Sequence, residues 1–233
     1  MILRLASAFL AVIVLADLGV MLRSPDLWMV PLALAGWYLA DLVSGVTHMV
    51  MDYRPSRPGV GLDRLYFYEG SRESADYVAL RRQVFARLGP IEKITYDFKN
   101  HHPRPDALGR RSMETQVGAT VAFATLPFAL LANAALIALD APPALFALLT
   151  SFLIGASFAQ YFHGALHRER VPVAVAALRR LRLLMRPGDH QRHHQTLACD
   201  FSTINGWSNP LLNRVFLALR RRGHLRDEGL IPR

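Results

Sequence analysis

The sequence predicts an all-α integral membrane fold with four transmembrane helices, mainly because the apolar residues are gathered in long blocks. Apolar residues make up 52% of the chain, and the mean hydropathy of +0.20 is high for a soluble domain. No charged residue occurs from Thr115 to Leu139 or from Ala141 to Phe162. As a helix of about 20 residues, each of these two blocks can cross a hydrocarbon core of about 30 Å.

Two earlier apolar blocks complete the set of spans. They cover residues 5–22 and 27–50, and only Asp17, Asp41 and His48 interrupt them. The first block lacks a clean small-x-small cleavage pattern, so we expect a retained span and not a signal peptide. We expect a single domain over residues 1–233, with spans at about 2–22, 27–51, 115–139 and 143–164.

Positive charge is concentrated in the two segments outside these spans. The net charge is +9, and residues 52–114 carry 12 Lys and Arg while residues 165–233 carry 13. Because positive charge marks the cytoplasmic side of a membrane protein, we expect both segments and both termini in the cytoplasm of a multi-pass protein, in a bacterial inner membrane. The arginines flank the spans and no nucleic-acid-binding motif occurs, so we expect no nucleic acid as a partner.

Further helices are expected within the two cytoplasmic segments. Residues 73–88 have helical composition, and residues 171–185 are typical of a basic amphipathic helix. The second helix would lie along the membrane surface or, alternatively, pack against the cytoplasmic part of the protein. Pro187-Gly188 should end it. The single cysteine, Cys199, excludes an internal disulfide and a cysteine-based zinc or iron–sulfur site.

The histidines are the strongest functional signal, because eight of the nine fall into four compact groups. Residues four apart on a helix lie on one face. The adjacent pair His101-His102 points in diverging directions, which could serve two metal ions or one ion and the groups that support its ligands. The isolated His224 is expected on the solvated surface. The candidate metal ligands are His48, His101, His102, His163, His167, His190, His193 and His194.

Two carboxylates share a helix face with the first of these histidines. Asp41, His48 and Asp52 stand at positions i, i+7 and i+11, so they lie on one side of the second span. Acidic groups within a membrane are costly and usually functional. We therefore expect Asp41 and Asp52 either to bind a metal or to support its ligands.

The expected topology brings all four histidine groups to the cytoplasmic face, where they would form a histidine-rich cap for two metal ions. Eight imidazoles exceed the need of one zinc ion, and imidazole suits iron, copper and zinc. Neither the HExxH pattern of zinc proteases nor the Glu-x-x-His pairs of soluble di-iron bundles occurs. A nitrogen-rich pair of irons in a membrane suits attack by O2 on an unactivated C–H bond.

The same residues resemble the plasmanylethanolamine desaturase family, also called the Kua family of membrane lipid desaturases. The resemblance covers about residues 40–55 and 95–220. Two departures are a longer segment at 53–95 and Gln116-Val117 in place of an expected Gly-Asp pair. The matching stretches are Ala40–His48 continuing to Asp52, Phe98–His102 followed by Arg111 and Glu114-Thr115, His163–His167, His190–His194, and Phe201–Trp207 with Asn209.

The resemblance implies an oxygen-dependent lipid desaturase in which the eight clustered histidines bind two irons and O2 is the co-substrate. Some family members form the vinyl ether of plasmalogens, and plant relatives desaturate an acyl chain of phosphatidylglycerol. The expected substrate is a membrane phospholipid, most specifically a 1-alkyl ether phospholipid that is converted to a plasmalogen. Arg104, Arg110 and Arg111 are candidates for binding the lipid phosphate, although they also serve as topology-setting charges.

Three alternatives remain open at this point. An acyl-lipid desaturase or a lipid hydroxylase would use the same metal site, and only product analysis separates them. A non-enzymatic metal-binding, transporting or regulatory membrane protein is the third alternative. The chain carries no flavin or haem motif, so an enzyme of this kind needs a separate electron donor, similar to cytochrome b5 or to a ferredoxin.

Overall fold

The computed structural model describes residues 1–232, and all regular secondary structure in that range is helical. Four helices are long and apolar enough to cross a membrane, which confirms the predicted spans to within a few residues and indicates a membrane protein. They are α1 (Ile2–Arg23), α2 (Met29–Tyr53), the continuous run Met113–Ala138, and α9 (Pro143–Leu166).

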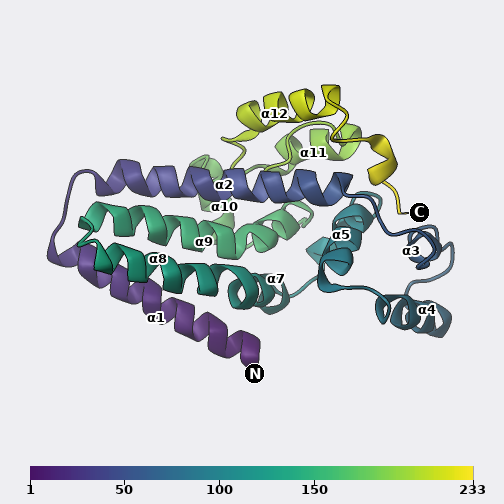
Figure 1. The fold of residues 1–233 in the computed structure, drawn as a ribbon, viewed down its shortest axis with the longest axis horizontal. Coiled ribbons are helices and arrows are strands. Elements are labelled where there is room, and N and C mark those ends of the chain that lie inside the picture. Colours follow the sequence, from purple (N-terminus) through teal and green to yellow (C-terminus); the bar gives the residue numbers. More distant parts are fainter. Residues whose placement is uncertain (233) are drawn as a thin grey trace.

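The four long helices form a bundle in which both short connections lie at the same end (Figure 1). The N-terminus and residues 54–112 lie toward or beyond the opposite end, whereas residues 167–232 lie along the side of α2 and α9, from their middle to that end. Helices α2 and α9 run in the same direction, form the most extensive contact in the bundle, and both finish at this second end. Helices α2 and α9 are the second and fourth spans, so they cross the bundle in the same direction.

The third long helix contains a π-helical turn that the sequence did not predict. It consists of α7 (Met113–Thr120), the turn η1 (Val121–Thr125) and α8 (Leu126–Ala138). The N–H of Leu126 donates to the carbonyl of Val121, five residues earlier. Pro127 follows and has no N–H to continue the regular α-helical pattern, and a widened turn next to a proline accommodates that loss.

Four short helices fill the segment between the second and third spans. They are α3 (Leu62–Tyr66), α4 (Ala75–Phe85), α5 (Pro90–His101) and α6 (Pro105–Gly109). Helix α4 confirms the helix predicted at 73–88, and Ser74 caps it by accepting from the N–H of Tyr77. The inward faces of α3, α4 and α5 form a small apolar core of their own, built on Leu62, Leu65, Tyr77, Val84, Leu88 and Tyr96.

The C-terminal segment corrects the helix predicted at 171–185. Helix α10 (Val173–Arg180) ends five residues earlier than expected, because Arg182 takes a left-handed conformation with φ of 59° that a helix cannot continue through. Pro187 does not end a helix. It begins α11 (Pro187–Thr196), where its missing N–H needs no partner. Helix α12 (Asn209–Arg221) and a short turn, η2 (Asp227–Gly229), complete the fold.

Close packing of α2 against α9 holds the bundle together. Gly36 in α2 lies against the Leu148 carbonyl, and a Cβ atom added at Gly36 would be 2.1 Å from that oxygen. The hydroxyl of Ser151 donates across this contact to the carbonyl of Ala33 at 2.7 Å. Small residues let membrane helices approach closely enough for such contacts. The two spans therefore have little freedom to shift relative to one another.

We predict that Gly36→Leu destabilises the protein by about 1–3 kcal/mol, since the added side chain forces the backbones of α2 and α9 apart. The matched control is Gly19→Leu, because nothing lies within 4 Å of a Cβ atom at Gly19. The measurement is the thermal unfolding midpoint of each variant in detergent. Equal midpoints for the two variants would show that the close approach of α2 and α9 does not limit stability.

Candidate metal centre

The structure brings the eight clustered histidines and Asp52 together at one end of the bundle. They form two groups, within each of which the candidate ligand atoms all lie within 4.8 Å of one another. The five-histidine group contains His101, His163, His167, His190 and His194. The aspartate group contains His48, Asp52, His102 and His193.

Four helices and their ends supply these side chains. Helix α2 provides His48 and Asp52, α5 and its C-terminal cap provide His101 and His102, α9 and its cap provide the HxxxH pair, and α11 provides the remaining three histidines. The adjacent pair His101-His102 diverges, so that one ring enters each group. Helix α11 is divided in the same way, because His193 belongs to a different group from His190 and His194.

The two groups lie side by side. The ring centroids of His101 and His102, one from each group, are 4.2 Å apart, and those of His48 and His163 are 4.9 Å apart. The two groups are therefore no farther apart than neighbouring side chains. Two ions bound here would share one buried pocket.

Backbone carbonyls fix the orientation of several rings. The Phe201 carbonyl accepts from Nδ1 of His48 at 2.9 Å, and the Cys199 carbonyl accepts from Nδ1 of His193 at 2.8 Å. The Phe98 carbonyl accepts in the same way from His101. Since a carbonyl can only accept, the proton sits on Nδ1 and the lone pair of Nε2 faces the site. Sequence reasoning missed these partners, because a backbone carbonyl has no residue-type signal.

Many of the polar atoms that face the two groups are buried without a hydrogen-bond partner. Such atoms are costly in a protein interior unless something binds them. Two further nitrogen pairs face each other closely, His102 with His193 at 3.2 Å and His163 with His190 at 3.1 Å. The unpartnered atoms are Nε2 of His48, His101, His167 and His194, Nδ1 of His190, and both carboxylate oxygens of Asp52.

The donor set therefore fits metal ions. In the aspartate group, Oδ2 of Asp52 lies 3.3–3.4 Å from Nε2 of each of the three histidines. An ion between them would satisfy the carboxylate and the imidazole lone pairs together. In the five-histidine group all donors are nitrogen, which suits iron, copper or zinc.

Burial keeps the histidines outside the spans neutral. It lowers the pKa of His101 and His190 well below the ordinary value of 6.5. It lowers the pKa of His167 to about 4 and that of His194 to about 3. A neutral imidazole has a free lone pair, whereas a protonated one has none. These four rings are thus able to bind metal at neutral pH without first losing a proton.

Asp41 lies outside both groups and binds a loop of the backbone. Its Oδ1 accepts from three successive N–H groups at 2.8–3.2 Å. Its Oδ2 accepts from the N–H and the hydroxyl of Ser208 at 3.0 and 2.6 Å. The three successive donors are Ile204, Asn205 and Gly206. The fully buried carboxylate thus fastens the loop between α11 and α12 to the middle of α2.

The three arginines predicted to bind a lipid phosphate lie outside the two histidine groups. The Arg104 guanidinium donates to the Asn100 side chain and the Tyr66 carbonyl, and Arg111 pairs with Asp97 at 2.9 Å. Arg110 is exposed, and so is His224, as expected of a surface residue. None of the three arginines belongs to the two metal-binding groups.

Lys99 is a buried residue near the site that sequence reasoning missed. Its ammonium donates to the Arg54 carbonyl and to the Ser56 hydroxyl, and burial lowers its pKa to about 8. This contact ties α5 to the C-terminal end of α2, two residues beyond Asp52. A lysine in an amphipathic helix of this composition gives no sign of such burial.

We predict that Asp41→Leu destabilises the fold by at least about 3 kcal/mol, because it leaves several buried donors without an acceptor. The control is Ser44→Ala, which removes a single acceptor for the N–H of Thr203 and should cost about 1 kcal/mol. Thermal unfolding in detergent and bound metal per chain are measured for both variants. An Asp41→Leu protein as stable as Ser44→Ala would contradict the assigned role of the carboxylate.

Comparison with known families agrees with this geometry. A family model described as a lipid desaturase domain matches residues 89–220, which is more than half of the 233 residues. The matched region includes every residue of the two groups except His48 and Asp52. No curated protein and no solved structure matches the chain. The chain belongs to the lipid desaturase family, and it is accordingly a lipid desaturase, an oxidoreductase whose two histidine-rich groups could hold metal.

Proposed function

We propose that the protein holds two iron ions, one in each histidine group, and uses O2 to introduce a double bond into a membrane phospholipid. The observation that carries this proposal is the convergence of nine buried or half-buried ligands on two adjacent groups, most of them with an unpartnered atom facing inward. When bound, the two irons supply the electrons that activate O2 and the oxidising power to remove hydrogen from an unactivated C–H bond.

The role of the protein is to hold the metal ligands in place and to orient their rings. The carbonyls of Phe201 and Cys199 keep the rings of His48 and His193 in one tautomer, so that their Nε2 atoms stay directed at the site. His48 and His193 are completely buried or nearly so, which supports exclusion of bulk water from the pocket. Exclusion of water protects reactive species from side reactions and favours transfer of hydrogen from the lipid.

The position of the site along the spans supports a bond near the lipid headgroup. His48 lies five residues before the end of α2, and His163 lies three residues before the end of α9. The histidine groups therefore sit at the ends of the spans, close to the depth of the glycerol backbone. We propose that this end faces the cytoplasm, together with both termini, because the flanking segments carry most of the positive charge.

The proposed product is the vinyl ether of a plasmalogen, formed from a 1-alkyl ether phospholipid. An ether oxygen stabilises a radical on the adjacent carbon, which eases removal of the first hydrogen. The shallow position of the site supports the same choice, since a bond deep in an acyl tail would require a long inward groove. A separate electron donor supplies the electrons that the lipid does not provide. Residues 1–233 together form the one domain that carries out this reaction.

We predict about two irons per chain after anaerobic reconstitution, because the ligands exceed the need of one ion.

Alanine in place of any one of the eight clustered histidines should abolish turnover while the protein still inserts into the membrane. His224→Ala is the matched control and should change little. Iron analysis and turnover assays check both points. One zinc per chain and no iron would overturn the di-iron assignment.

We predict fatty aldehydes from the lipids of cells that express the protein and are supplied with alkylglycerol, because mild acid cleaves vinyl ethers to aldehydes. The aldehydes should appear only with active protein and with O2, and they are measured by mass spectrometry of the acid-treated extract. The inactive control is His163→Ala. A new acyl double bond without aldehydes would leave the desaturase intact and refute the plasmalogen assignment.

A further inference from the structure

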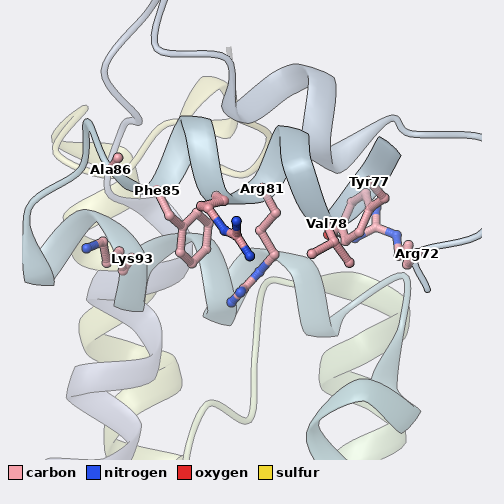
Figure 2. A pocket seen from close by; sticks show the side chains of 8 residues that line it. Arg72, Tyr77, Val78, Arg81, Phe85, Ala86 and Lys93 are labelled. Atoms are coloured by element: carbon pink, nitrogen blue, oxygen red, sulfur yellow. The ribbon is translucent and has the colours of Figure 1, made fainter. Parts of the chain in front are cut away.

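A basic surface cavity is lined by residues of α4 and by Lys93 of α5 (Figure 2), and no histidine lines it. Its volume is about 750 Å³, and no acidic residue lines it. Figure 2 shows the Arg81 side chain beside the ring of Phe85, and the guanidinium lies 4.2 Å from the ring centroid. The cations and aromatic rings that define this basic cavity are Arg72, Arg81, Arg82, Lys93, Tyr77 and Phe85.

Three of the four cations are available to a partner. Arg81 and Arg82 are exposed and Lys93 is half-buried. Among residues 1–232, no carboxylate lies within salt-bridge distance of any of the three. Arg72 is different, because it holds the cavity wall in place. Unpaired cations around a cavity without acids produce a local positive potential that attracts an acidic molecule.

The cavity is connected to the metal centre by α5. Lys93 and His101 lie on this one helix, eight residues and thus about 12 Å apart at 1.5 Å per residue. A second connection runs through Arg72, which donates to the Tyr77 hydroxyl at 2.9 Å and to the Asn100 side chain at 3.1 Å. Asn100 directly precedes His101. A molecule bound in the cavity would therefore lie about one short helix away from the five-histidine group.

The position of α4 favours a soluble partner over the membrane. Helix α4 lies beyond α5, at the end of the molecule farthest from the short connections of the bundle (Figure 1). Residues 75–85 also precede the matched family region at 89–220. The cavity is thus partly built from a segment outside the shared domain.

We propose that this basic cavity is the docking surface for the electron donor, a small acidic one-electron carrier protein. The inference rests on the proposed function. For each double bond, O2 accepts four electrons, of which two leave the lipid with its two hydrogens and two come from the donor. Two protons from solvent complete the two water molecules that form. The donor binds twice per turnover, so weak, charge-steered docking suits its task.

The test compares two charge-reversed variants of the full-length protein in neutral-lipid nanodiscs. One carries Arg81→Glu with Arg82→Glu in the C-terminal half of α4. The matched control carries Arg221→Glu with Arg222→Glu, an equally exposed arginine pair at the end of α12. Binding of a plant-type ferredoxin, a small acidic carrier, is measured at low and high ionic strength. We expect the α4 variant to lose about tenfold in affinity at low salt, and the control to lose little.

A kinetic measurement adds an independent readout. Ferredoxin-supported turnover should fall in the α4 variant, whereas turnover supported by reduced methyl viologen should match the wild type, because that small reductant needs no docking surface. Equal ferredoxin affinity in the wild type and the α4 variant, or an equal loss in both variants, would overturn the proposal. Binding is measured without turnover, so absence of desaturation would refute the proposed function and leave the docking result to be judged by itself.

Discussion

The buried carboxylate of Asp41 is the interaction on which the geometry of the metal centre depends. By accepting five hydrogen bonds from the loop between α11 and α12, it fixes that loop against α2. The same loop contains Phe201, whose carbonyl orients His48. A buried charge is tolerated when several donors surround it. Because the donors and the Phe201 carbonyl belong to one loop, the contact with Asp41 also fixes the carbonyl that orients His48.

Burial and hydrogen bonding act together on the histidines. Burial holds His101 and His190 neutral, and backbone carbonyls determine which ring nitrogen carries the proton in His48 and His193. A site assembled from neutral rings with fixed tautomers needs little rearrangement to receive metal. The cost is a set of unpartnered polar atoms in the interior, which metal binding would offset. Stability and metal content should therefore be coupled in this protein.

Helix-scale features were predictable from the sequence, while features that depend on backbone contacts were not. The uncharged blocks predicted the spans, and the four-residue spacings of His163 with His167 and of His190 with His194 predicted that each pair shares a group. The spacing did not show that His193 enters the other group. An acid within a span signalled a functional residue at Asp41, but residue type cannot distinguish a metal from backbone N–H groups as its partner. The left-handed Arg182 that ends the helix region early gives no signal in composition either.

The order of the ligands along the chain has a consequence for biosynthesis. His48 belongs to the second span, whereas the α11 histidines and the Phe201 carbonyl come close to the C-terminus. Neither histidine group is complete until nearly the whole chain has left the ribosome and the spans have packed. Loading of metal into the two groups would therefore follow insertion into the membrane, and a chain truncated before α11 would lack a complete set of ligands.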